Sequence, residues 1–430
     1  MCSKMSSRKI LFLSGLFGNA LEWYDFVIYG YFAPVFAKLF FPVKDPAISL
    51  ILSFSAFAIG FFARPLGALF IGLIGDKKGR KPALLISILI MGIPSFLIIF
   101  LPTYETLGII APLLLTLLRI LQGFSAGGEY TTSVSFLLEH SPPNRRAFWS
   151  SVNLFGAILG IWLGSLSATL LHHFLNQKSL ETFGWRLAYL PTIFLAVIGY
   201  LIRKHTYETP AFVREKLSPS KGFPLYLALK EYPRPFLLTL ILSMVQGVAF
   251  YTIFVYFPTY FSRYFEIPAD SALLSNTLSM ILLNLLILPC AFLSDQVGRK
   301  PLFLFSLLAY ALSAFFFNQF LIPKGYFYIV LSHLTLAFIS GFFMSVLPVT
   351  LAELFPVKIR NTSFSVLYNL SLALFGGTLP TIATFFIEKK GILNFPGIYL
   401  SLVCILALII TLFYLPETHP LKVKGSAQRS

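Results

Sequence analysis

The amino-acid sequence predicts an all-α, polytopic membrane protein built from two related six-helix halves, and three observations lead to this fold class. The 430 residues are 57% hydrophobic and only 12% charged, and their mean hydropathy is +0.80. Twelve apolar segments are long enough to cross a bilayer. A charged turn that follows one of these segments recurs about half a chain later. This composition excludes an ordinary soluble protein.

The twelve segments form two bundles with a linker between them. They cover residues 12–36, 48–74, 82–102, 107–138, 148–174, 187–203, 236–261, 271–293, 301–321, 326–353, 362–387 and 397–415. We expect an N-terminal bundle at 1–203, a basic, proline-containing cytoplasmic linker at 204–235, a C-terminal bundle at 236–416 and a short cytoplasmic tail at 417–430. The first segment is too long for a secretory signal and carries two carboxylates, so we expect it to be retained.

The repeated turn reads Asp-x-x-Gly-Arg-Lys-Pro. The first copy contains Asp76, Gly79 and Arg80, and the second contains Asp295, Gly298 and Arg299. The glycine allows a sharp turn between helices, the basic residues favour the cytoplasmic face, and the aspartate can accept hydrogen bonds from a helix N-terminus. A single copy is equally consistent with an ordinary positive-inside loop. Two copies half a chain apart predict an internal duplication.

Two further pairs of motifs support the duplication. Glu-x-x-Pro-x-x-x-Arg follows the fourth and the tenth segments, as Glu139 to Arg146 and as Glu353 to Arg360. Glu-Thr ends both halves, as Glu208-Thr209 and Glu417-Thr418. We expect these charges to form interhelical ion pairs that close the inner side of a pore, and the alternative is a set of unrelated exposed turns.

The formal net charge of +16 reflects membrane orientation rather than nucleic-acid binding. Most of the 33 lysine and arginine residues lie in segments that are cytoplasmic when both termini are inside, which is the positive-inside pattern. We therefore predict no nucleic-acid partner, and we expect a monomer in the lipid bilayer. The three cysteines, Cys2, Cys290 and Cys404, have no paired spacing in external loops, so we predict no disulfide, metal or other cofactor.

The first half carries charged residues inside its apolar segments. One face of the first segment, at steps of three and four, presents Gly15, Gly18, Glu22, Asp25 and Tyr29. Carboxylates near the bilayer centre are costly, so these two are expected to face a hydrated cavity lined by protein. The alternative is a structural ion pair with Arg64 of the second segment, which lies at a similar depth.

The fourth segment carries the second arginine inside a predicted helix. Arg119 and Gln122 are one helical turn apart, and Glu129 lies ten residues nearer the cytoplasm than Arg119. A guanidinium is a natural partner for a carboxylate substrate, and the alternative for Arg119 is a structural cation bonded to neighbouring helices. The nearby glycines allow close helix approach, as do Gly156, Gly160 and Gly164 in the fifth segment.

The second half has no Asp, Glu, Lys or Arg near the middle of its segments. Its candidate polar residues are Gln246, Tyr251, Tyr256, Asn276, Asn284, Tyr368 and Asn369. They can orient a substrate by hydrogen bonds and cation–π contacts, although packing is the alternative for each of them. His333 is expected to be a hydrogen-bonded interfacial residue rather than a proton carrier.

These motifs resemble those of the major facilitator superfamily. The resemblance rests on the paired turns, on Arg119-x-x-Gln122-Gly123 and on Pro416-Glu417-Thr418. The stretch from Gly18 to Phe26, with Glu22-Trp23-Tyr24-Asp25, together with Arg64-Pro65-x-Gly67 and Gly127-Gly128-Glu129-Tyr130, resembles the metabolite:proton symporters of this superfamily. That group includes permeases for proline and glycine betaine, α-ketoglutarate, shikimate and citrate.

The resemblance implies a transporter, not an enzyme, with two six-helix bundles and a midmembrane site exposed alternately to either side of a bacterial cytoplasmic membrane. It implies proton symport of a small zwitterion or carboxylate, with a proline- or betaine-type solute favoured. The alternatives are symport of an organic acid such as α-ketoglutarate, citrate or shikimate, efflux by antiport, and a nontransporting metabolite receptor. The short tail has no heptads, so osmotic regulation through a coiled coil is not expected.

Charge counting assigns roles within this framework. Three negative charges, on ionised Glu22, Asp25 and Glu129, face two positive charges, on Arg64 and Arg119. One bound proton would balance the set. We predict that Glu22 and Asp25 compete for Arg64 and share the proton. Substrate contacts are predicted for Trp23, Tyr29, Arg119, Gln122, Tyr251, Tyr256 and Asn369. A gating role is predicted for the repeated turns and for Glu139, Arg146, Glu353 and Arg360.

Overall fold

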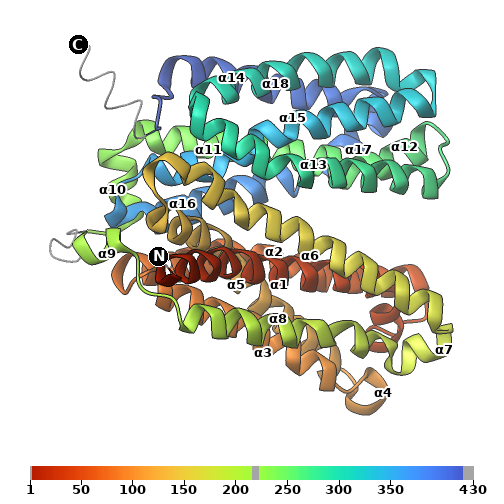
Figure 1. The fold of residues 1–430 in the computed structure, drawn as a ribbon. Coiled ribbons are helices and arrows are strands. Elements are labelled where there is room, and N and C mark those ends of the chain that lie inside the picture. Colours follow the sequence, from red (N-terminus) through yellow and green to blue (C-terminus); the bar gives the residue numbers. More distant parts are fainter. Residues whose placement is uncertain (1, 216–221, 420–430) are drawn as a thin grey trace, which may run out of the picture. The chain divides into compact units, whose positions relative to one another are not determined.

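A computed structural model of the chain describes residues 2–215 and 222–419, and the regular structure in these residues is helical (Figure 1). The helices form two compact units. The first unit contains Met1–His140 and Val152–Ser220, and the second contains Ser141–Ser151 and Lys221–Ser430. The sequence did not predict that residues 141–151 would group with the second half of the chain.

Long helices dominate the first unit. Its elements are α1 (Cys2–Phe40), α2 (Pro46–Lys77), α3 (Arg80–Phe100), α4 (Tyr104–Leu107), α5 (Ile110–His140), α6 (Arg146–Phe174), α7 (Gln177–Ser179), the π-helical segment η2 (Leu180–Gly184), α8 (Trp185–Lys204) and α9 (Pro210–Glu215). Only the part of α6 from Val152 onward belongs to this unit. Helix α2 packs against α5, and α3 packs against both α5 and α8, while α1 packs against α2 and α8.

The second unit repeats the helical pattern with more interruptions. It contains η1 (Pro143–Arg145), α10 (Pro224–Glu231), α11 (Pro233–Phe250), η3 (Tyr251–Tyr256), α12 (Phe257–Tyr264), α13 (Ala269–Val297), α14 (Arg299–Phe316), η4 (Phe317–Leu321), η5 (Ile322–Lys324), α15 (Tyr326–Glu353), α16 (Val357–Ser371), η6 (Leu372–Gly376), α17 (Leu379–Lys390) and α18 (Phe395–Tyr414). The π-helical segments η3 and η6 each interrupt a long membrane helix. Such interruptions often occur at functional positions.

Eleven helices of the described residues are long and apolar enough to cross a membrane. They coincide with eleven of the twelve predicted segments. The remaining segment, 12–36, lies within α1, which has 39 residues and carries Glu22 and Asp25 inside its apolar sequence. Two of the eleven, Pro233–Tyr264 and Val357–Lys390, are continuous spans that contain the π-helical turns.

Glycines set the closest helix contacts in the first unit. A Cβ added to Gly123 of α5 would lie 1.8 Å from the carbonyl oxygen of Gly60 in α2, and one added to Gly127 would lie 1.9 Å from that of Arg64. The backbones of α2 and α5 therefore touch, and any residue with a Cβ atom at these positions would prevent the contact. Gly156 and Gly160 of α6 approach α1 in the same way, so the predicted packing role of these glycines is confirmed.

This contact yields a stability prediction. Gly127→Ala should lower the unfolding temperature of the purified protein, because its methyl group meets backbone atoms that cannot turn aside, and overpacking of this kind costs about 1–3 kcal/mol. Gly30→Ala in α1 is the matched control, since nothing lies within 4 Å of its added Cβ. Removing a helical glycine there should be neutral or stabilising. Equal unfolding temperatures for Gly127→Ala and the wild type would contradict the contact.

Candidate functional site

Three buried carboxylates in the first unit each face a different arginine. Arg64 Nη2 lies 3.3 Å from Glu22 Oε1, and Arg119 Nη2 lies 3.2 Å from Asp25 Oδ2. The third pair joins Glu129 of α5 to an arginine of α8, described below. Burying an unpaired charge is strongly unfavourable, so each pair explains how its carboxylate is tolerated inside the helical unit.

Asp25 is the centre of a hydrogen-bonded cluster that spans three helices. Its Oδ1 accepts hydrogen bonds from Ser95 Oγ of α3, at 2.7 Å, and from Gln122 Nε2 of α5, at 3.0 Å. The Arg119 guanidinium donates to the hydroxyl of Tyr189 in α8, at 2.9 Å, and lies 4.4 Å from the ring centre of Tyr29. Arg119 Nε and Nη1 have no hydrogen-bond partner among the described residues.

Glu22 and Asp25 do not share Arg64, so the prediction that they compete for it is wrong. Arg64 contacts Glu22, whereas Asp25 is bonded to α3 and α5. Residues three apart on a helix differ by about 60° in direction, which is enough to turn one carboxylate toward α2 and the other toward α5. For Glu22 the structural ion pair that the sequence left open as an alternative is present.

The charge count changes because Arg203 is buried. This residue, at the end of α8, is 1% exposed. Its Nη1 donates to Glu129 Oε2 at 3.0 Å, its Nη2 contacts Oε1, and Ser87 Oγ donates to Oε2 at 2.5 Å. A Cβ on Gly18 would lie 1.8 Å from Arg203 Nη2, so Gly18 makes room for the guanidinium. Three carboxylates therefore meet three arginines, and the predicted excess of one negative charge is wrong.

In the first unit the repeated turn is held by a network around Arg80. Its guanidinium contacts Asp76 Oδ1 at 3.1 Å and Glu139 Oε1 at 3.0 Å. Glu208 accepts hydrogen bonds from the backbone N–H groups of Arg80 and Lys81, at 3.0 and 3.1 Å, which satisfies the first turn of α3. Gly79 has φ of 113°, a conformation that favours glycine, and a Cβ there would lie 2.2 Å from Glu208.

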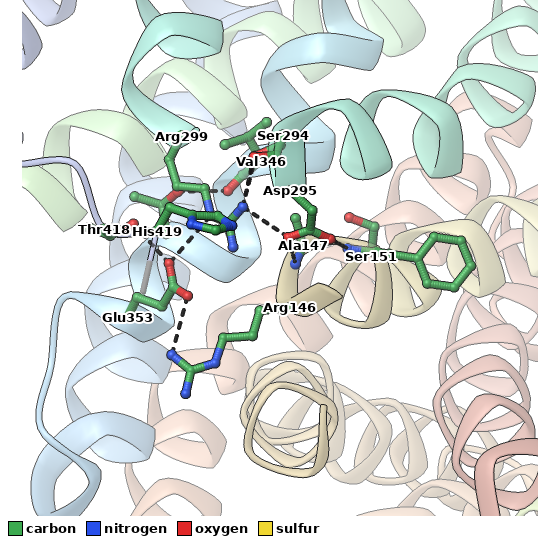
Figure 2. A network of polar contacts seen from close by, with 12 residues as sticks. Arg146, Ala147, Ser151, Ser294, Asp295, Arg299, Val346, Glu353, Thr418 and His419 are labelled. Atoms are coloured by element: carbon green, nitrogen blue, oxygen red, sulfur yellow. Dashed lines mark hydrogen bonds and ion pairs between the residues drawn. The ribbon is translucent and has the colours of Figure 1, made fainter. Parts of the chain in front are cut away.

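The second unit contains the same network at the second copy of the turn (Figure 2). Arg299 contacts Asp295 at 2.9 Å and Glu353 at 3.5 Å, and Glu417 accepts from the backbone N–H of Arg299 at 2.9 Å. Gly298 has φ of 108°. Residues of all three motifs thus meet in each unit: the turn with Glu139 and Glu208 in the first, and the turn with Glu353 and Glu417 in the second. The expected interhelical ion pairs are present for Glu139 and Glu353. Glu208 and Glu417 accept from backbone N–H groups instead, and Arg146 of the first copy lies in the second unit.

Asp295 has an additional contact at the start of α6. It accepts hydrogen bonds from the backbone N–H groups of Ala147 and Phe148, both at 2.9 Å, as Figure 2 shows for Ala147. This is the interaction with a helix N-terminus that the motif predicts. Arg146 contacts Glu353 at 3.5 Å, and Arg360 donates to the carbonyl oxygen of Phe355 at 3.2 Å.

Several polar candidates of the second unit lie in or near its π-helical segments. Tyr251 and Tyr256 belong to η3, and the Tyr256 hydroxyl is 3.2 Å from Thr384 Oγ1 of α17. Asn369 donates to the carbonyl oxygen of Ser365 in its own helix at 2.9 Å. His333 is bonded through both ring nitrogens, to Ser275 Oγ at 3.0 Å and to the carbonyl oxygen of Ile253 at 2.8 Å. Its prediction as a hydrogen-bonded residue is confirmed.

A helical membrane protein that repeats one charged network in both units, and that buries paired charges in one of them, has the architecture of a duplicated membrane transporter. A family model described as "Sugar (and other) transporter" matches residues 11–222 and 220–427. The proton:xylose symporter XylE, bound to 6-bromo-6-deoxy-D-glucose, has the same fold, with a TM-score of 0.82 at 18% identity over 96% of this chain and 97% of that structure.

Curated relatives agree with the family model. The proline/betaine transporter of Escherichia coli K12 is 34% identical over 97% of this chain and 85% of its own length. The putative proline/betaine transporter of Staphylococcus haemolyticus is 32% identical over 99% of this chain and 91% of its own length. The chain therefore belongs to the sugar (and other) transporter family of the major facilitator superfamily, and it is a multi-pass membrane transporter rather than an enzyme.

His419, which the sequence did not single out, lies against the second network outside the membrane-spanning helices. The side chain is 3% exposed, and neither ring nitrogen has a hydrogen-bond partner among the described residues. Burial lowers the pKa of His419, and so does Arg299, near which Figure 2 shows the ring, while Asp295, Glu353 and Glu417 act in the opposite direction. The folded protein therefore favours the neutral imidazole.

A pH dependence follows from this environment. Below a pH of about 6.5 the unfolded chain binds a proton at this histidine that the folded chain takes up only at lower pH, so acidification should reduce stability. We expect the unfolding temperature to fall between pH 7.5 and pH 5.5, and to fall less in His419→Gln. The stability that the neutral His419 imidazole contributes is fully present above the pKa of this histidine in the unfolded chain. It is lost as the pH falls toward the lower pKa of the folded protein. Identical pH profiles for the two proteins would contradict this role of His419.

Proposed function

We propose that the chain takes up a small zwitterion of the proline or betaine type together with a proton. The observation that carries the proposal is Arg119, a buried guanidinium with one acidic partner and with two nitrogens that have no hydrogen-bond partner among the described residues. The relatives from Escherichia coli and Staphylococcus haemolyticus support the substrate class. We place the protein in the bacterial cytoplasmic membrane, as a monomer with both termini inside.

Asp25 and Arg119 provide a physical route for coupling. While Asp25 is ionised, it competes with a substrate carboxylate for the Arg119 guanidinium. A proton on Asp25 removes that competition, and Ser95 and Gln122 still hold the carboxyl group in place. The guanidinium can then bind the substrate carboxylate through its planar fork of donors. Proton binding and substrate binding are favourable together, as symport requires.

Glu129 has a different role in this proposal. Both of its oxygens are held by Arg203, and Ser87 donates to one of them. A carboxylate with this many donors is better suited to fixing α3, α5 and α8 than to exchanging a proton during each cycle. We therefore assign the coupling proton to Asp25, and we assign Glu129 with Arg203 to the support of the unit.

The coupling proposal is tested in proteoliposomes with radiolabelled proline or glycine betaine. Asp25→Asn should abolish accumulation driven by a proton gradient but retain exchange of internal for external substrate, because the neutral amide mimics the protonated acid. Arg119→Ala should lose binding itself. Glu105→Gln, an exposed acid of α4, is the matched control and should behave as the wild type. Concentrative uptake by Asp25→Asn under a proton gradient alone would reject the assignment.

We also propose that the two turn networks stabilise one of the conformations between which the carrier alternates. Each network joins a turn glycine, an arginine and three acidic residues, so its loss changes one conformation more than the other. The ion pairs Arg80–Asp76 and Arg299–Asp295 are nearly fully buried, and removing one partner leaves the other uncompensated. Glu139, which contacts Arg80, lies 20 residues from Arg119 along α5, about 30 Å.

Asp76→Asn and Arg80→Ala are expected to slow transport by about 5- to 150-fold, the range of typical coupling free energies. Substrate affinity measured on the purified protein should change little, because the turn is remote from Arg119. Lys77→Ala is the control, since this exposed lysine lies in the same turn. Wild-type transport rates in both Asp76→Asn and Arg80→Ala would remove the basis for a gating role.

A further inference from the structure

Arg64 lies among three aromatic rings of the first unit. Its guanidinium carbon is 6.0 Å from the ring centre of Trp23, 5.8 Å from that of Phe26 and 5.5 Å from that of Phe61. We refer to Trp23, Phe26 and Phe61 as the ring cage. The rings of Phe26 and Phe61 are tilted by 56° at a centroid distance of 5.3 Å. Several ring faces around one cation form the arrangement that recognises quaternary ammonium groups.

Arg64 is paired less completely than Arg203, the buried arginine that binds Glu129. Arg64 makes a single 3.3 Å contact with Glu22 Oε1, whereas Arg203 binds both oxygens of Glu129 and two backbone carbonyl groups. Glu22 Oε2 and Arg64 Nε have no hydrogen-bond partner among the described residues. Glu22 is nonetheless only 1% exposed. A buried carboxylate oxygen without a donor marks a position where a cationic ligand gains from binding.

The ring cage lies close to the proposed carboxylate anchor. Glu22 and Asp25 are three residues apart on α1, a rise of about 4.5 Å along the helix axis, and their side chains turn toward α2 and α5. The contacts of α2 with α5 at Gly60 and Gly123 hold the helices of Arg64 and Arg119 together. A small solute whose ammonium and carboxylate groups lie a few bonds apart can therefore address both pairs at once.

We propose that the ring cage and Glu22 bind the cationic end of a zwitterionic substrate, in exchange for the Arg64 guanidinium. This inference rests on the proposed function, in which Arg119 binds the carboxylate end. One monovalent cation replaces another, so Glu22 stays neutralised throughout the exchange. The site selects against simple organic acids, because a solute without a cationic group cannot replace Arg64. The ligand class is a quaternary or secondary ammonium carboxylate.

The test is equilibrium binding of radiolabelled glycine betaine to the purified full-length protein. Phe61→Leu keeps an apolar side chain but removes a ring face, and it should raise the Kd by about 2- to 30-fold, the range of cation–π contacts from exposed to desolvated sites. Phe61→Tyr retains the face and should bind as the wild type. Phe62→Leu is the matched control, because the neighbouring Phe62 is 77% exposed and does not belong to the ring cage.

A second series separates the cation–π contact from packing, and it remains informative if Phe61→Leu does not fold. Tryptophans carrying increasing numbers of fluorine atoms at position 23 keep the shape of the ring and weaken its negative face, so the Kd should rise with each fluorine. A Kd that is insensitive to both Phe61→Leu and fluorination overturns the ring cage while leaving the proposed function intact. A wild-type protein that binds neither proline nor glycine betaine overturns both.

Discussion

The structure of the first unit depends on the pairing of charge inside a membrane helix bundle. A carboxylate among apolar helices needs a cation, and each of the three carboxylates finds an arginine on a different helix: α2 for Glu22, α5 for Asp25 and α8 for Glu129. Asp25 ties α1 to α3 and α5, and Glu129 ties α5 to α3 and α8. The charged residues that mark the functional region are therefore the same residues that fix how its helices pack.

Glycines make this pairing geometrically feasible. Gly18 leaves the space that the Arg203 guanidinium occupies, and Gly127 lets the backbone of α5 contact the carbonyl oxygen of Arg64. In lipid the helices gain little from hydrophobic association, so close backbone approach and polar contacts supply much of their attraction. A methyl group at position 18 would occupy the space of the Arg203 guanidinium, and one at position 127 would press on the backbone of Arg64. The packing of these helices is therefore linked directly to the ion pairs of Arg203 and Arg64.

The sequence predicted the helical segments and the paired networks well, because both depend on position along the chain. Eleven segments recur as membrane-length helices. Glu208 and Glu417, which were expected to form interhelical ion pairs, instead accept hydrogen bonds from the first backbone N–H groups of α3 and α14. The partners of Asp25 and Glu129 were not predicted, because residue spacing fixes depth in a helix to about one turn but not which neighbour a side chain faces. Arg203 was missed for a related reason: beside Lys204 at the end of a segment, it has the sequence signature of a cytoplasmic loop.

The two units share the residues of the repeated turn but differ in the polar residues at the centres of their helices. Each retains a left-handed glycine, an arginine and a glutamate that caps the following helix, since every copy of the turn must satisfy the same backbone N–H groups. No such requirement applies to the middle of a helix. There the first unit carries ion pairs, whereas the second places Tyr251 and Tyr256 in the π-helical interruption of a continuous span. Duplication thus preserved the turns, where backbone geometry allows few solutions, and left the helix centres free to specialise.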